Sequence, residues 1–227
     1  YRAVHAPRDE AEAERARTRL AFDELLLLQL GVMMRRHHLR ERLRAPALRW
    51  SDELDARIRE RFPFPLTAAQ ARVIREIASD LSREGPMNRL LQGDVGAGKT
   101  VVALYGMLLA AATGHQACLM APTELLAEQH LASIRAMLQD SDVEIVLLTG
   151  GLPAAVRRER LERIASGEVD IVVGTHALLT ESVRFKSLAL AVVDEQHRFG
   201  VVQRAALREK SASSDQVPHI LVMTATP

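Results

Sequence analysis

The residues best suited to chemistry form one glycine-rich run, Gly93-Asp94-Val95-Gly96-Ala97-Gly98-Lys99-Thr100, which fits the pattern G-x-x-x-x-G-K-[ST]. Glycines let consecutive backbone N–H groups converge on an anion, and a helix that begins at Thr100 adds partial positive charge. We expect Lys99 to reach the β- and γ-phosphates of ATP and the Thr100 hydroxyl to help bind Mg²⁺. The alternative is a glycine-rich turn that fits the pattern by chance.

An acidic motif follows the apolar run Leu188–Val193 and reads Asp194-Glu195-Gln196-His197. An aspartate at the carboxyl end of a buried strand is costly unless it meets a cation, and Mg²⁺ on a nucleotide supplies one. Glu195 is placed to polarise an attacking water, and His197 to relay the state of the γ-phosphate. The alternatives are a pair of helix-capping acids and a structural histidine.

Composition limits the class of protein. The chain has 227 residues, of which 48% are hydrophobic and 26% charged, and its net charge is +1. These values are typical of globular chains, exclude disorder as the main state and give no overall attraction to polyanions. No apolar run approaches 18 residues, so we expect no membrane-spanning helix. The single cysteine, Cys118, excludes a disulfide framework, favours a reducing intracellular setting and is expected to be buried filler.

The elements that must position these residues begin with a segment of different composition, residues 1–61. We expect a helical lead-in there, with one or two helices over Asp9–Arg44. Its basic cluster Arg35–Arg40 is either a solvated helix face or a phosphate contact, and Trp50 is expected to pack rather than to stack on a base. The predicted apolar face of the helix consists of Phe22, Leu26, Leu30 and Met33.

Residues 62–227 alternate between helical and strand patterns, which predicts an α/β domain with a parallel sheet flanked by helices. Thr67 is a predicted N-cap, with Gln70 completing a capping box. The face of that helix is expected to contain Val73, Ile74, Ile77 and Leu81. The predicted strands are Arg89–Gln92, Ala117–Ala121, Val143–Leu148, Ile171–Val173, Leu188–Val193 and His219–Met223. The helices predicted between them are Thr100–Ala112, Glu124–Gln139 and Pro153–Ser166. Such sheets bind ligands at the carboxyl ends of their strands.

Four further pieces give the region from about Phe62 to Pro227 a specific resemblance to superfamily 2 helicases, and more narrowly to the RecG family of branched-DNA helicases. They are Phe62-Pro63-Phe64-Pro65-Leu66-Thr67-Ala68-Ala69-Gln70, which resembles a Q motif, Ala121–His130 (motif Ia), Asp194–Gly200 (motif II) and Thr224-Ala225-Thr226-Pro227 (motif III). The related transcription-repair coupling factor usually has Thr at the position of Glu124 and Glu at that of Gln196. These two residues therefore favour the RecG form of the motifs over that of the coupling factor.

The resemblance implies a RecA-like first motor lobe over 62–227 that binds ATP and Mg²⁺. It assigns the adenine contact to Phe64 and Gln70, although Gln70 could serve the capping box alone. It implies DNA-backbone contacts at six residues whose alternative roles are turns and N-caps: Pro122, Thr123, Gly150, Gly174, Thr175 and His176. Coupling roles are implied for Gln196, Arg198, Thr224, Ala225 and Thr226. For Arg198, Gln203 and Arg204, which follow motif II, a role in coupling or DNA contact and a place as plain surface residues both stay open.

The same resemblance implies an ATP-dependent DNA helicase that remodels forks and Holliday junctions in recombination and repair. We expect a monomer in the cytoplasm, associated with the nucleoid and not with a membrane. Such motors need a second lobe and, in RecG-like proteins, a wedge domain, and we identify neither in these residues. Two alternatives therefore stay open, a double-stranded DNA translocase like the coupling factor, and a binding module without appreciable turnover when these residues are isolated.

Overall fold

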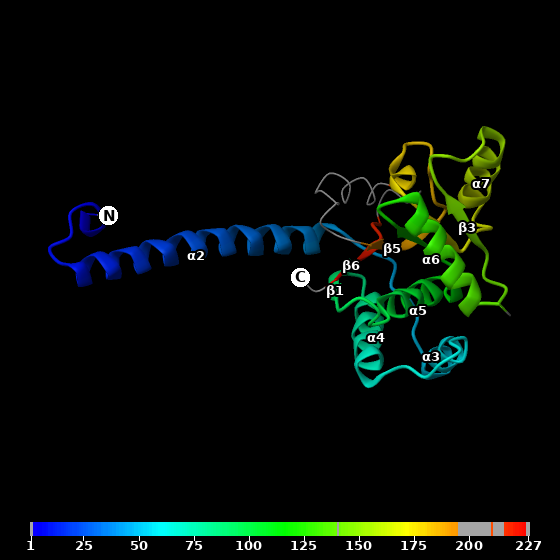
Figure 1. The fold of residues 1–227 in the computed structure, drawn as a ribbon, viewed down its shortest axis with the longest axis horizontal. Coiled ribbons are helices and arrows are strands. Elements are labelled where there is room, and N and C mark those ends of the chain that lie inside the picture. Colours follow the sequence, from blue (N-terminus) through cyan, green and yellow to red (C-terminus); the bar gives the residue numbers. More distant parts are fainter. Residues whose placement is uncertain (1, 140, 195–209, 211–215, 226–227) are drawn as a thin grey trace. The chain divides into compact units, whose positions relative to one another are not determined.

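The computed structural model describes residues 2–139, 141–194, 210 and 216–225 (Figure 1). It divides the chain into two compact units, Tyr1–Arg42 and Leu43–Pro227. The boundary between the two units coincides with the end of a long N-terminal helix.

The first unit consists of the short helix α1 (Arg2–His5) and the long helix α2 (Glu10–Arg42). Asp9 caps α2, because its carboxylate accepts a hydrogen bond from the Glu12 N–H at 2.6 Å. The expected helical segment is thus one continuous helix, and the four residues of its predicted apolar face are all more than half exposed, as are their neighbours Leu25, Leu27 and Leu28. Apolar residues surround the helix because the run is nearly continuous in sequence, so it presents no single apolar stripe.

Two other features of this first unit bear on the sequence-based expectations, its basic cluster and the apolar length of α2. Apart from His37, which is exposed, the side chains of the basic cluster Arg35–Arg40 lie outside the described residues. Although α2 has 33 residues, neither it nor another helix in the described part of the chain is apolar over a stretch long enough to cross a membrane.

The second unit begins at Leu43, before the expected boundary at residue 62. Ala45, Leu48 and Ile58 are buried in its core, and the Leu48 N–H donates to the Leu81 carbonyl at 2.9 Å. This stretch includes a helix that sequence reasoning missed, α3 (Asp52–Arg59), which Ser51 caps by accepting from the Leu54 N–H. Residues 43–61 join the second unit because their apolar side chains pack on its core.

The sheet of the second unit has six parallel strands in the order β1-β6-β5-β2-β4-β3. Its strands are β1 (Asn88–Gln92), β2 (Gln116–Met120), β3 (Ile145–Leu148), β4 (Ile171–Gly174), β5 (Leu188–Asp194) and β6 (His219–Thr224). The other elements are α4 (Ala68–Leu81), α5 (Lys99–Ala112), α6 (Glu124–Met137), α7 (Ala154–Ser166) and the 3₁₀ turn η1 (His176–Leu179). All six predicted strands and the predicted helices are confirmed, with small differences at their ends.

Alternate residues along each strand pack on opposite faces of the sheet, as the pleat requires. Leu119 and Val173 belong to the core covered by α3, α4, α5 and α6, whereas Met120 and Val172 belong to the core beneath α7 and η1. Cys118 lies in the second core with no exposed surface, and burial raises the pKa of its thiol to about 12. Its predicted role as an inert buried residue is therefore confirmed.

The helices that flank the glycine-rich loop are firmly packed. α4 and α5 lie side by side (Figure 1), and the predicted face of α4 is confirmed because Ile74, Ile77 and Leu81 are fully buried. α5 is buried on nearly all sides from Val101 to Ala110. A loop fixed between a strand of the sheet and a buried helix is a rigid frame for a ligand.

Candidate active site

The glycine-rich loop connects the end of β1 at Gln92 to the start of α5 at Lys99. Gly96 and Gly98 have φ values of 82° and 78°, in the left-handed region where a side chain would be strained. Gly98 is also the N-cap of α5 and has no side chain that could compete with an anion for the N–H groups at the helix start. The strand, loop and helix required by the motif are therefore all present.

Lys99 folds back over this loop. Its ammonium donates hydrogen bonds to the carbonyl oxygens of Gly93 at 2.7 Å and Asp94 at 2.9 Å. Val95 at the tip of the loop is 89% exposed, so the loop opens to solvent rather than to the core. A cation and the backbone N–H groups at the start of α5 thus meet at one exposed edge of the sheet, as phosphate binding requires.

Asp194 lies at the same edge of the sheet as the loop. Gln92 pairs with Thr224 of β6, and Asp194 pairs with the adjoining residue Met223 on the other side of that strand. Because neighbouring strands lie about 4.8 Å apart, the backbones at Gln92 and Asp194 are separated by about 10 Å across β6. That span suits a triphosphate and its metal ion.

The side-chain oxygen atoms at this edge of the sheet are suitable ligands for Mg²⁺. Thr100 lies in the first turn of α5 and offers a hydroxyl, and Asp194 offers a carboxylate, both of which are the oxygen ligands that Mg²⁺ prefers. The described residues hold no cluster of three histidine, cysteine or carboxylate side chains able to bind a metal. A metal here would accordingly take its remaining ligands from phosphates and water, as Mg²⁺ does in phosphoryl-transfer sites.

The carboxylate of Asp194 has a protein partner that sequence reasoning gave no role. Its Oδ2 accepts a hydrogen bond from Nε2 of His130, on α6, at 2.7 Å. The two side chains are 16% and 14% exposed. The sequence contained no direct signal for this pair, because its members are 64 residues apart.

Gln70 contacts the glycine-rich loop directly. Its Oε1 accepts from the Thr67 N–H at 2.9 Å, while the Thr67 hydroxyl accepts from the Gln70 N–H, so the predicted capping box is present. Its Nε2 donates to the Ala97 carbonyl at 3.1 Å, and a Cβ on Gly98 would lie only 2.3 Å from that nitrogen. Phe64 is 43% exposed. Adenine recognition by Gln70 and Phe64 stays a prediction.

The candidate DNA-contacting turns lie on the other half of the same sheet edge. Pro122 follows β2, Gly150 follows β3, and Thr175 follows β4, and these three strands are neighbours in the order β2-β4-β3. His176 is exposed, whereas Thr175 is buried. The sheet therefore brings the predicted turns together, although their contact with DNA stays a prediction.

Two of these turn residues already have structural roles. The Thr123 hydroxyl caps α6 by accepting from the Leu126 N–H at 3.2 Å. A Cβ on Gly174 would lie 2.2 Å from the Leu148 carbonyl oxygen, so close packing of β4 on β3 requires glycine there. The alternative roles considered for these positions, as turn and cap, are therefore present.

The remaining motif residues lie partly outside the described residues. Thr224 ends β6, and its carbonyl accepts from the Gly93 N–H at 3.4 Å, so this part of motif III adjoins the glycine-rich loop. Ala225 follows it. The predicted catalytic and coupling residues that lie outside the described residues are Glu195, Gln196, His197, Arg198, Gln203, Arg204 and Thr226. Their roles stay predictions.

Trp50 lies in the lead-in to α3 and is 40% exposed. Its indole N–H donates to the Tyr105 hydroxyl at 3.1 Å, and that hydroxyl donates to Asp55 at 2.5 Å. Burial, and after it the bond to Asp55, raises the pKa of Tyr105. The network joins the lead-in to α5, which agrees with a packing role for Trp50.

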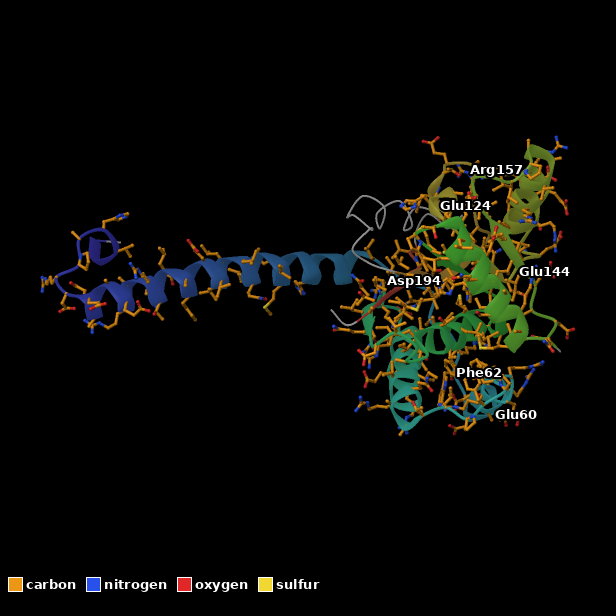
Figure 2. The ribbon with its side chains drawn as sticks, in the orientation of Figure 1. Glu60, Phe62, Glu124, Glu144, Arg157 and Asp194 are labelled. Carbon is orange, nitrogen blue, oxygen red and sulfur yellow. The ribbon has the colours of Figure 1, made fainter. Side chains whose placement is uncertain are left out.

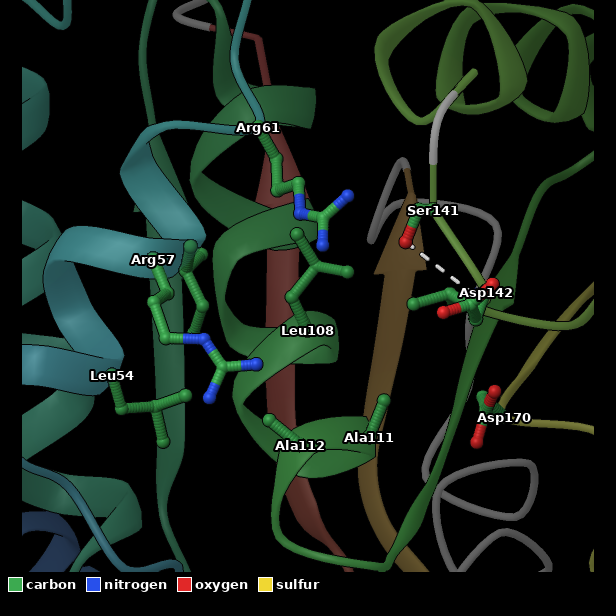
Figure 3. A pocket seen from close by; sticks show the side chains of 11 residues that line it. Leu54, Arg57, Arg61, Leu108, Ala111, Ala112, Ser141, Asp142 and Asp170 are labelled. Atoms are coloured by element: carbon green, nitrogen blue, oxygen red, sulfur yellow. Dashed lines mark hydrogen bonds between the residues drawn. The ribbon is translucent and has the colours of Figure 1, made fainter.

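A cavity of about 250 Å³ lies at the opposite edge of the sheet (Figure 3). Arg57 and Arg61 line one side of it, Asp142 and Asp170 the other side, and Leu108 of α5 lies between them. The two aspartates precede β3 and β4, so this cavity opens at the amino ends of the strands. It is therefore separate from the glycine-rich loop and Asp194, which lie at the carboxyl ends.

The fold and this site together define a motor-type nucleotide-binding domain, and the chain belongs to the DEAD/DEAH box helicase family, whose sequence model matches residues 67–227. Within that family it is similar to the ATP-dependent DNA helicase RecG of Bacillus subtilis (strain 168), with 48% identity over 226 residues, covering 100% of this chain and 33% of that protein. RecG of Mycobacterium tuberculosis (strain ATCC 25618 / H37Rv) is 47% identical over 239 residues, covering 100% of this chain and 32% of that protein. The resemblance inferred from the motifs is confirmed.

A solved structure shows the same relationship. RecG bound to a three-way DNA junction matches this fold with a TM-score of 0.84 and 38% identity, over 96% of this chain and 28% of that one. The predicted RecA-like fold class is thereby confirmed. The chain spans about a third of the length of the curated relatives it matches.

Proposed function

We propose that this chain is the ATP-binding motor lobe of a DNA helicase that couples ATP hydrolysis to the remodelling of branched DNA. The observation that carries the proposal is the arrangement along one sheet edge. The lysine-bearing loop lies at β1, Asp194 lies at the end of β5, and the candidate strand-contacting turns lie at β2, β4 and β3. A change at the phosphates can therefore reach the DNA-contacting turns through a few adjacent strands.

The chemistry assigns one role to each residue. The N–H groups of the loop and the Lys99 ammonium would hold the β- and γ-phosphates, and Thr100 and Asp194 would hold Mg²⁺. The metal, when bound, would neutralise charge that develops on the transferring phosphoryl group. Glu195 would orient the attacking water and accept its proton. Hydrolysis would thus depend on positioning and electrostatics rather than on a covalent intermediate.

Forks and Holliday junctions are the proposed substrates. The similarity to RecG proteins supports this choice, as does the match to a RecG bound to a three-way DNA junction. We further propose that a second motor lobe and a wedge domain complete the site in the full-length protein, since the relatives are about three times as long as this chain. In such motors the second lobe supplies arginines that stabilise the transition state.

The test is to replace the two central residues in the full-length protein. Lys99→Ala and Glu195→Gln are each expected to abolish DNA-stimulated ATP hydrolysis while leaving binding to a synthetic fork within about twofold, because neither contacts DNA in the proposal. Phosphate release and fork binding by fluorescence anisotropy measure the two properties. Hydrolysis at the wild-type rate in both variants would refute the assigned roles.

A further inference from the structure

The pair formed by His130 and Asp194 joins two motifs that have separate roles in the proposed function. The Nε2–H of His130 donates to Oδ2 of Asp194 at 2.7 Å. An ionised carboxylate can only accept, so the imidazole is the donor. A carboxylate held through one oxygen has one orientation and can offer its other oxygen to a cation. This is how the groups around a metal site fix the geometry of its ligands.

The helix that carries His130 is anchored at its amino end to the candidate DNA-contacting turns. α6 begins at Glu124, which Figure 2 labels together with Asp194, and Oε1 of Glu124 accepts from the Gly151 N–H at 3.1 Å. A Cβ on Gly150 or Gly151 would lie 3.3 Å from the same carboxylate, so the turn after β3 fits closely against α6. Thr123 caps the helix from the turn after β2.

Along most of its length α6 is fixed to the sheet. Ala127, Leu131 and Ile134 are buried against the strands, one turn apart along the same side of the helix. A helix held in this way moves as a unit, because its backbone hydrogen bonds and its buried side keep their geometry. A displacement at Thr123 or Glu124 therefore displaces His130 and with it the Asp194 carboxylate.

We propose that His130 is a positioning residue that orients Asp194 for Mg²⁺ and transmits strand contact at the start of α6 to the metal. The first part depends only on the described geometry and on nucleotide binding at the loop. The second part rests on the proposed function, because it assumes that the turns at Thr123 and Gly150 contact DNA. His130 touches neither nucleotide nor DNA in this proposal.

Three variants of the full-length protein test the proposal. His130→Ala removes the donor. His130→Gln keeps an N–H donor at a reach close to that of Nε2. Ser133→Ala is the matched control, since Ser133 is exposed on the same helix. Each is titrated with Mg²⁺ in the presence of a fluorescent ATP analogue, and each is assayed for kcat and KM for ATP with and without fork DNA.

Loss of a group that orients a metal ligand typically costs 10- to 100-fold in metal affinity or activity. For His130→Ala we expect the half-saturating Mg²⁺ concentration to rise about 10-fold and the DNA-stimulated kcat to fall by at least as much. KM for ATP should stay within about twofold, because the loop and Lys99 are unchanged. His130→Gln should recover most of both losses, and Ser133→Ala should match the wild type.

Two results would overturn the proposal. One is a His130→Ala protein with wild-type Mg²⁺ dependence and DNA-stimulated kcat. The other is an equal loss in the Ala and Gln variants that follows a fall in thermal stability, which would make His130 a packing residue only. A wild-type protein without DNA-stimulated hydrolysis would instead refute the proposed function, and the Mg²⁺ titration would still decide whether His130 orients Asp194.

Discussion

Replacement of Gln70 separates two roles that the structure brings into competition. An amide can pair with the N6 and N7 edge of adenine through one donor and one acceptor. In this structure the acceptor already binds the Thr67 N–H and the donor already binds the Ala97 carbonyl. The amide keeps a second N–H and a second lone pair, but Thr67 and Ala97 fix its orientation. We therefore expect the amide to turn toward adenine and to give up both contacts.

The expected size of the effect follows from this exchange. Each of the two hydrogen bonds contributes about 1 kcal/mol net, so releasing both costs about 2 kcal/mol. A bidentate pair with adenine contributes about 1–3 kcal/mol. With the upper value of about 3 kcal/mol for the pair, the net preference that Gln70 gives to ATP over a pyrimidine triphosphate is about 1 kcal/mol, or about fivefold in the ratio of dissociation constants. A pair formed without competition would give a ratio up to about 100-fold.

The assay compares ATP with UTP as competitors of a fluorescent nucleotide. Gln70→Ala should reduce the preference for ATP about fivefold, and Gln70→Glu should do the same while keeping the acceptor for Thr67. Equal weakening of both nucleotides with an unchanged ratio would refute adenine reading and make Gln70 a brace of the glycine-rich loop. A loss of ATP preference near 100-fold would instead show that Gln70 reads adenine without giving up its contacts to Thr67 and Ala97.

Two further predictions concern stability of the 227-residue chain. His219 is buried, with Nδ1 accepting from the Met87 N–H and Nε2 donating to the Pro46 carbonyl, and burial lowers its pKa. As the pH falls below about 6.5, His219 binds a proton in the unfolded chain but stays neutral in the folded chain. The free energy of unfolding should therefore fall by up to about 1.4 kcal/mol per pH unit. Equal urea midpoints at pH 7.5 and pH 5.5 would contradict this expectation. Gly174→Ala should destabilise the chain by about 2 kcal/mol or more, because its Cβ would overlap the Leu148 carbonyl, and a midpoint within error of the wild type would show that β3 and β4 can separate without cost.

Much of the scaffold could be predicted because its signals are local. Five of the six strands, β2 to β6, are short and largely apolar runs, and the start of α4 is specified by Thr67 and Gln70 within one turn. Gly96 and Gly98 of the loop are needed for a backbone with positive φ, which is a property of single residues. The signals for α3 were local as well, since Ser51 precedes three acidic residues and two arginines follow, and a search for caps would have found it.

The sequence by itself therefore determined the glycine-rich loop, the succession of strands and helices, and the position of Asp194 at a strand end. Only the tertiary structure decided the strand order, and with it which loops share an edge, that His130 reaches Asp194 and that Glu124 holds Gly151. It also decided that residues 43–61 join the second unit and that the apolar residues of α2 stay exposed within the first. The physical reason is that hydrophobic periodicity fixes how each segment folds, whereas contacts between distant segments depend on how the strands pair and how the helices pack on them.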